Sequence, residues 1–434
     1  MSTTPGRQAS SRRRRSVEDL QNLPRSAALS QLYRATEAAA PPNYPPESMF
    51  SPSSLWEWFR NYLAYLFKKK HMFPPYTASP QNAIYDLLDE NGTENVRLSV
   101  AGDWGTGTNE AVAVARQMTN SKPHFTIHIG DVYYVGDPPS VNENCLGTKN
   151  PNNNYDAVTW PIGERGSFAL NGNHEMYANG GGYFDVFIPN LGLRDSAGKM
   201  LGQQTSFFCL QNKYWRIIAI DTGYNSTGIL SLFPGLGLVC KLPDELIQWL
   251  TQVVAPDEDK RGLVIMSHHQ YYSAFQEQYR RPAQQLWASG ITRPVLWFWG
   301  HEHRLAGYDL YGTDNLKSHG RCVGHGGMPV DRGTPKPGPP VSFYDDRSST
   351  TGFGMNGHVN LSFSGSELSA VYIDLDGNQL LREQWLADAS GAVQLLSQQK
   401  LTKDPNFYVA EPPSLAHPGR PDDSCAARCS GQRR

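Results

Sequence analysis

The sequence predicts an α/β fold in which parallel strands carry ionisable residues at their carboxyl ends. Short apolar runs recur through the middle of the chain, and several of them end in aspartate or histidine. Segments with helical periodicity lie between some of these runs, and glycine-rich turns separate others. Alternating strands and helices are typical of parallel sheets, and ligands bind at the carboxyl edge of open α/β sheets.

The first strand–helix–strand unit lies at residues 96–131. The apolar run VRLSVAG at 96–102 leads directly to Asp103, and NEAVAVARQM at 109–118 has the pattern of a helix. The next apolar run, HFTIHIG at 124–130, leads to Asp131. This order predicts two neighbouring parallel strands, each followed by an aspartate.

The same pattern returns later in the chain. Four further apolar runs end in polar or ionisable residues: SFALNGNHE at 167–175, WRIIAIDT at 215–222, GLVIMSHH at 262–269 and PVLWFWGHEH at 294–303. PDELIQWLTQVV at 243–254 predicts a helix between two of them. From His358 to Trp385 the residues alternate in polarity around a turn at Asp376–Gly377, which predicts antiparallel strands.

The ends of the chain differ in composition from its middle. Residues 1–52 are rich in Ser, Arg, Ala and Pro, and residues 401–434 form a Pro-rich tail, so both are expected to be disordered. The main domain is expected at 96–400.

Residues 53–95 are expected to form a helical, aromatic segment. A capping-box pattern at Ser54 and Glu57 predicts a helix start, and three lysines follow at 68–70. This helix either docks on the main domain or makes a peripheral membrane contact through 55–70, with its aromatics in the membrane surface and its lysines facing anionic lipid.

The composition fits a globular protein and excludes several classes. The 434 residues carry a formal net charge of -2, which gives no overall attraction to nucleic acid. No apolar run is long enough to span a membrane and no signal peptide follows the N-terminal arginines, so we expect a cytoplasmic protein. The six cysteines lack the spacing of a zinc site.

Five short motifs supply oxygen and imidazole ligands directly after the predicted strands. They are GDWG at 102–105, GDVYY at 130–134, GNHE at 172–175, SHH at 267–269 and GHEH at 300–303. Such residues could hold two metal ions about 3.5–4 Å apart, which would neutralise a phosphate ester and activate water. Two close cations need a shared carboxylate, for which Asp131 is the candidate. Oxygen ligands together with imidazoles suit Fe, Mn or Zn.

These motifs, in this order, resemble the calcineurin-like metallophosphoesterase superfamily. Two details are similar to its purple acid phosphatase branch, especially the short tartrate-resistant type. Gly105 stands where other branches place a second ligand, and Tyr134 lies three residues after Asp131. The resemblance covers about 96–385 and implies a four-layer α/β/β/α sandwich with mixed sheets, preceded by the helical N-terminal segment.

The resemblance also implies a role for each motif residue. One metal ion would be held by Asp103, Asp131, Tyr134 and His303, and the other by Asp131, Asn173, His268 and His301. The cofactors would be two metal ions, Fe with Fe, Zn or Mn. His268 is preferred to its neighbour His269 because relatives use the first histidine of this motif.

The implied activity is that of an acid phosphatase-like hydrolase with a binuclear metal centre. A metal-bound hydroxide would attack a small phosphate monoester while His174 assists the leaving group. His325, in the loop VGHGG, is a further candidate for substrate binding. Two alternatives remain open: a phosphodiesterase acting on a nucleotide or lipid head group, and a non-catalytic, membrane-attached binding protein.

Overall fold

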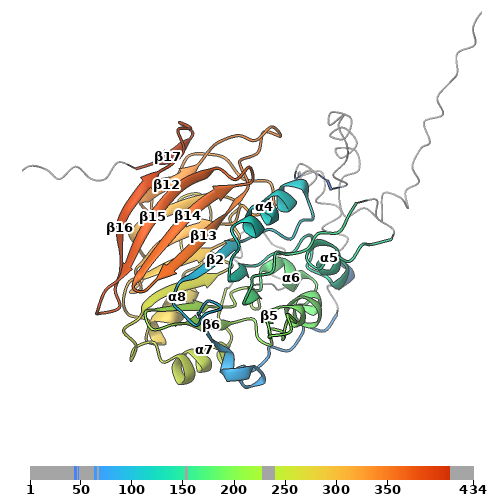
Figure 1. The fold of residues 1–434 in the computed structure, drawn as a ribbon, viewed down its shortest axis with the longest axis horizontal. Coiled ribbons are helices and arrows are strands. Elements are labelled where there is room, and N and C mark those ends of the chain that lie inside the picture. Colours follow the sequence, from blue (N-terminus) through green and yellow to red (C-terminus); the bar gives the residue numbers. More distant parts are fainter. Residues whose placement is uncertain are drawn as a thin grey trace, which may run out of the picture.

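The computed structural model has two large β-sheets packed face to face, with helices on their outer sides (Figure 1). It describes residues 44, 45, 47, 63–65, 68–151, 155–226 and 240–410. The aromatic run at 55–62 and the capping box at Ser54 and Glu57 lie outside the described residues, as do 1–43 and the tail from 411.

The first sheet has eight strands in the order β16-β15-β14-β13-β2-β3-β4-β5. Its strands are β2 (Val96–Ala101), β3 (Phe125–His128), β4 (Gly166–Ala169), β5 (Gly192–Leu193), β13 (Gly357–Ser364), β14 (Glu367–Asp374), β15 (Gln379–Ala387) and β16 (Val393–Lys400). The three strands β2, β3 and β4 are parallel, whereas β13 to β16 form an antiparallel meander that joins the sheet through β2. The strands and the turn predicted between His358 and Trp385 are therefore confirmed.

The second sheet has nine strands in the order β1-β6-β7-β8-β9-β11-β10-β12-β17. Its strands are β1 (Ile84–Asp86), β6 (Phe208–Gln211), β7 (Trp215–Ala219), β8 (Gly262–Ser267), β9 (Val295–Trp299), β10 (Leu305–Tyr311), β11 (Ser318–Val323), β12 (Val341–Asp345) and β17 (Phe407–Val409). Here β7, β8 and β9 are parallel, and all their residues are buried. Burial on both faces explains why these strands are continuous apolar runs.

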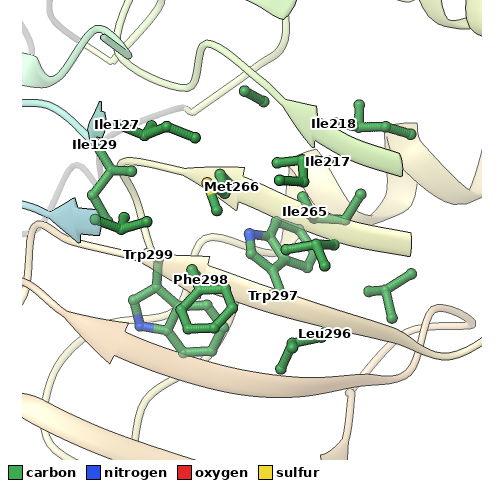
Figure 2. Packing of buried hydrophobic residues seen from close by; sticks show 14 of the residues in the cluster. Ile127, Ile129, Ile217, Ile218, Ile265, Met266, Leu296, Trp297, Phe298 and Trp299 are labelled. Carbon is green, nitrogen blue, oxygen red and sulfur yellow. The ribbon is translucent and has the colours of Figure 1, made fainter. Parts of the chain in front are cut away.

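The main hydrophobic core lies between the two sheets. Figure 2 shows side chains of β7, β8 and β9 packed together, with Ile127 and Ile129 at the end of β3 beside them. The same cluster includes Val359 and Leu361 of β13, from the antiparallel part of the first sheet. Apolar residues that point inward from both sheets thus hold the sandwich together.

Helices cover the outer face of each sheet and complete the four layers (Figure 1). On the first sheet lie α4 (Asn109–Asn120), α5 (Pro138–Asn144) and α6 (Asn173–Tyr177), followed by the short helices η5 (Tyr183–Phe187) and η6 (Ile188–Asn190). On the second lie α7 (Asp244–Trp249), continued by η8 (Leu250–Val254), and α8 (Arg280–Ala288). This mixed α/β sandwich confirms the predicted fold class.

Both predicted boundaries of the main domain need correction. Ile84–Asp86 forms β1, which pairs in parallel with β6, and is preceded by the short helices η3 (Tyr76–Ala78) and η4 (Pro80–Ala83). At the other end, Phe407–Val409 forms β17 on β12. Residues 84–86 were predicted to belong to a helical segment and residues 407–409 to a disordered tail. Both form strands because pairing with the edge of a sheet stabilises them more than their local sequence would indicate.

The described part of the aromatic segment contacts the main domain. The Tyr65 hydroxyl donates to Asp137 Oδ2 over 3.0 Å, and the His71 ring stacks on Phe184 with centroids 4.5 Å apart. Lys70 Nζ donates to the Tyr224 carbonyl over 2.5 Å. For residues 65, 70 and 71, these contacts agree with docking on the main domain, which was one of the two alternatives predicted for the aromatic segment. No helix among the described residues has the length and apolar character needed to cross a membrane.

Candidate metal centre

The five predicted motifs meet at the carboxyl ends of five parallel strands. Three motifs follow β2, β3 and β4 of the first sheet, and two follow β8 and β9 of the second. The centre therefore lies where the two sheets meet, and each sheet supplies part of it. All seven predicted metal ligands are at these strand ends: Asp103, Asp131, Tyr134, Asn173, His268, His301 and His303.

Asp103 organises one half of the centre. Its carboxylate is fully buried, and Oδ1 lies 3.5 Å from His303 Nε2. Its Oδ2 accepts a hydrogen bond from the backbone N–H of His301 over 2.8 Å. Asp103 thus contacts the GHEH motif of the other sheet through both of its oxygens.

Tyr133 enters this half of the centre in place of Tyr134, which corrects the predicted ligand. The Tyr133 hydroxyl lies 2.9 Å from Asp103 Oδ1, 3.2 Å from Asp131 Oδ2 and 3.0 Å from His303 Nε2. The Tyr134 ring packs instead with Val135 and Ala178.

Asp131 lies between the two halves. Its Oδ2 is 3.2 Å from both the Tyr133 hydroxyl and His268 Nε2, and its Oδ1 accepts from the backbone N–H of His174 over 3.0 Å. Burial alone would raise the pKa of Asp131, but the neighbouring His268 and His174 hold it well below its usual value. This position is the one that a bridging carboxylate requires.

The second half of the centre is richer in nitrogen. His268 Nε2 lies 3.1 Å from Asn173 Oδ1, and one ring nitrogen of His301 belongs to the same cluster of potential ligand atoms. His268 Nδ1 donates to the Ile129 carbonyl over 3.0 Å, because a carbonyl can only accept. That bond leaves the Nε2 lone pair directed at Asn173 and Asp131, which is the usual arrangement of a metal-binding histidine.

His174 lies at the entrance to the centre. Its side chain is 18% exposed, and its Nε2 is 3.8 Å from Asp131 Oδ2. Its Nδ1 contacts the Tyr134 carbonyl, and its ring packs against Tyr133 with centroids 4.3 Å apart. These contacts hold the ring in one orientation, with Nε2 toward the carboxylates.

The backbone at the strand ends is arranged for close ligand packing. Asp103, Asp131 and His301 have positive φ angles of 57°, 72° and 64°, which non-glycine residues rarely adopt. Such conformations cluster at functional sites. A Cβ on Gly172 would lie 2.1 Å from Asp131 Oδ1, so only glycine fits beside this carboxylate.

His325 does not line the centre, which corrects its predicted role in substrate binding. Its side chain is 1% exposed, and its Nε2 lies against Gly357 on β13. Burial and the nearby His358 lower its pKa to about 3. Gly324 lies beside Asp103, so the intervening turn carries the next side chain away from the centre and into the core.

The structure also reveals functional candidates that were not predicted from the motifs. Glu175, whose carboxylate is fully buried, accepts from the backbone N–H groups of Gly172 and Asp131. Tyr279 lies 3.2 Å from His301 Nε2 through its hydroxyl. Glu175 belongs to the GNHE motif and could have been found there, whereas Tyr279 lies in a loop with no recognisable pattern.

The donor set fits bound metal ions. Among the described residues, the ion-pair partners of the Asp103 and Asp131 carboxylates are histidines and not lysine or arginine. Asp103, Asp131 and His268 offer ligand atoms that all lie within 4.8 Å of one another. Buried carboxylates without a basic partner are costly, and cations would compensate their charge.

The two mixed sheets form an α/β domain, and the aspartates and histidines at their strand ends could hold metal ions. Residues 96–305 match the family model of the calcineurin-like phosphoesterases. The chain therefore contains a calcineurin-like phosphoesterase domain, and the predicted superfamily is confirmed. A search of curated protein sequences found no match.

Solved structures show general similarity to this chain. GAP50, the anchor in the inner membrane complex of Plasmodium, is 11% identical with a TM-score of 0.44, and the match covers 72% of this chain and 89% of GAP50. Purple acid phosphatase PPD1 from yellow lupin seeds is 16% identical with a TM-score of 0.43, over 68% of this chain and 53% of PPD1. PhoD is 12% identical with a TM-score of 0.42, over 71% and 73%. Because all three TM-scores are below 0.5, we draw no conclusion about function from these similarities.

Proposed function

We propose that this protein is a binuclear-metal phosphoesterase that hydrolyses small phosphate monoesters, as a purple acid phosphatase does. The observation that carries the proposal is the position of Asp131, whose Oδ2 contacts a group from each half of the centre, Tyr133 and His268. A single carboxylate that contacts two ligand groups is suited to hold two cations close together.

The proposed ligand sets follow the two halves of the centre. One ion would be held by Asp103, Asp131, Tyr133 and His303, and the other by Asp131, Asn173, His268 and His301, whose side chains lie close together in the structure. The mixture of oxygen and imidazole donors suits Fe paired with Fe, Zn or Mn. When bound, the two ions would neutralise the phosphate charge and lower the pKa of water.

His174 is the proposed general acid for the leaving group. Its ring is oriented by the Tyr134 carbonyl at Nδ1, and it is partly exposed, so a substrate can reach Nε2. In the proposed step the proton on Nε2 passes to the leaving oxygen as the P–O bond breaks. The alcohol then leaves as a neutral molecule.

The experiment is hydrolysis of p-nitrophenyl phosphate and of its bis ester by the purified protein, with Fe, Zn and Mn tested in turn. Asp131→Asn removes the negative charge of the proposed bridging carboxylate and should lower turnover by at least about 10²- to 10³-fold, the loss seen when one preorganised stabilising group is removed. Asp314→Asn is the matched control, because Asp314 pairs with Arg280 instead of a predicted ligand.

Each outcome has a distinct meaning. Turnover of the monoester that needs metal and is lost in Asp131→Asn supports the proposal. Preference for the bis ester would replace the monoesterase with a phosphodiesterase on the same centre. Folded, metal-loaded protein that hydrolyses neither ester would refute the proposed activity.

A further inference from the structure

A second histidine, His269, directly follows the predicted ligand His268 at the end of β8. Its side chain is 1% exposed. Its Nδ1 lies 3.0 Å from Thr222 Oγ1, but among the described residues its Nε2 has no hydrogen-bond partner. A buried polar atom without a partner is costly, so this nitrogen calls for an explanation.

The His269 ring lies among the other imidazoles of the centre. Its centroid is 4.5 Å from that of His301 and 4.9 Å from that of His268. One ring nitrogen of each of these three histidines lies within 4.8 Å of the others. Ligands on one zinc ion lie about 2.0–2.1 Å from it, so small side-chain movements suffice to bring all three nitrogens onto one ion.

Thr222 determines which nitrogen of His269 is free to bind. Thr222 Oγ1 already accepts the backbone N–H of His269 over 3.0 Å. If the threonine hydroxyl donated to Nδ1, the proton of the neutral ring would be on Nε2, buried with no acceptor. If Nδ1–H donates to Thr222 instead, Nε2 has a lone pair, which a metal ion would satisfy.

We propose that His269 is a third imidazole ligand in the half of the centre formed by Asn173, His268 and His301. This inference rests on the metal centre of the proposed function, but not on turnover. It makes the two halves chemically unequal. The half with three imidazoles favours Zn or Fe over Mg or Ca, while the half at Asp103 is richer in oxygen donors.

Metal titration of the full-length protein tests the proposal. Protein stripped with a chelator is titrated with Zn²⁺ by calorimetry, and a Co²⁺ titration records the visible spectrum. His269→Phe keeps an aromatic ring but removes both nitrogens. We expect two ions in the wild type, and in the variant at least about tenfold weaker binding of one ion with an altered Co²⁺ spectrum.

His319→Phe is the matched control, since His319 is also a mostly buried histidine but packs on Trp385 of β15. It should leave both affinities unchanged. Thr222→Val retains His269 but removes the hydroxyl at Nδ1, and should weaken the same ion to a smaller extent. If His269→Phe fails to fold, His269→Gln is measured in its place, with the same expectation.

Several results would overturn the inference. One is a folded His269 variant that binds both ions with wild-type affinity and gives an unchanged Co²⁺ spectrum. Another is unchanged metal affinity with a raised KM for p-nitrophenyl phosphate, which would make His269 a substrate contact. A wild type that binds two ions but hydrolyses no ester would refute only the proposed activity, whereas one that binds no metal would refute both.

Discussion

Replacing Tyr133 with phenylalanine removes one hydroxyl that contacts both predicted carboxylate ligands and His303. The three contacts are 2.9 Å to Asp103, 3.2 Å to Asp131 and 3.0 Å to His303. A hydrogen bond to a charged group contributes roughly 1.5–3 kcal/mol, and about 1.4 kcal/mol corresponds to a tenfold change in affinity. Tyr133→Phe should therefore weaken binding of the ion at Asp103 about 10- to 100-fold.

Tyr134→Phe is the matched variant, because Tyr134 is the neighbouring tyrosine and its ring packs with Val135 and Ala178. It should bind that ion within about threefold of wild type, a difference of under 1 kcal/mol. Calorimetric metal titration measures both affinities. In ferric protein, a visible absorption band from phenolate to iron should disappear only in Tyr133→Phe. Loss of the band and of affinity in Tyr134→Phe, with Tyr133→Phe unaffected, would refute this reading of the site.

Three further predictions concern the surroundings of the centre. Gly172→Ala should abolish metal binding and lower the free energy of unfolding by about 1–3 kcal/mol, because the new Cβ would lie 2.1 Å from Asp131 Oδ1. Gly92 also has a positive φ, +74°, but the space around it is open, so Gly92→Ala should keep its full metal content in elemental analysis. Because the pKa of His325 is lowered to about 3 in the folded protein, only the unfolded chain takes up a proton on this histidine between about pH 6.5 and 3. The free energy of unfolding of the wild type, measured by chemical unfolding, should therefore fall as the pH drops from about 6.5 toward 3. His325→Leu should show a weaker loss and should bind substrate normally. Chelation should lower the Tm in calorimetry and added Zn²⁺ should restore it, and an unchanged Tm would contradict metal binding to the folded state.

The fold could be predicted from sequence where the signals were local. The apolar runs before Asp103 and Asp131 are indeed parallel strands, and the intervening helix α4 starts where Thr108 caps it by accepting from the backbone N–H of Ala111. The strands β1 and β17 were missed because each has three residues and is stabilised by pairing with a distant strand. Such pairing leaves no local pattern.

The position of the candidate site could be predicted where a motif places a possible ligand at a strand end. Asp103, Asp131 and His268 converge as expected because parallel strands end at a common edge. The choice between Tyr133 and Tyr134 depends on which way the loop turns after Asp131, and spacing alone does not determine that. His325 was expected to bind substrate from an exposed loop, but its side chain is buried. A glycine-rich stretch such as VGHGG can form either an exposed loop or a buried turn, so its composition did not distinguish the two.

The division of the centre between two sheets has a consequence for biosynthesis. The ribosome completes the segment with Asp103, Asp131 and Asn173 well before it reaches His301 and His303. Strand β13, which pairs with β2, is made later still. The full set of predicted ligands therefore exists only after residue 303 has been made. We expect metal loading to be a late event, and a chain released before residue 301 should have too few imidazoles to retain two ions.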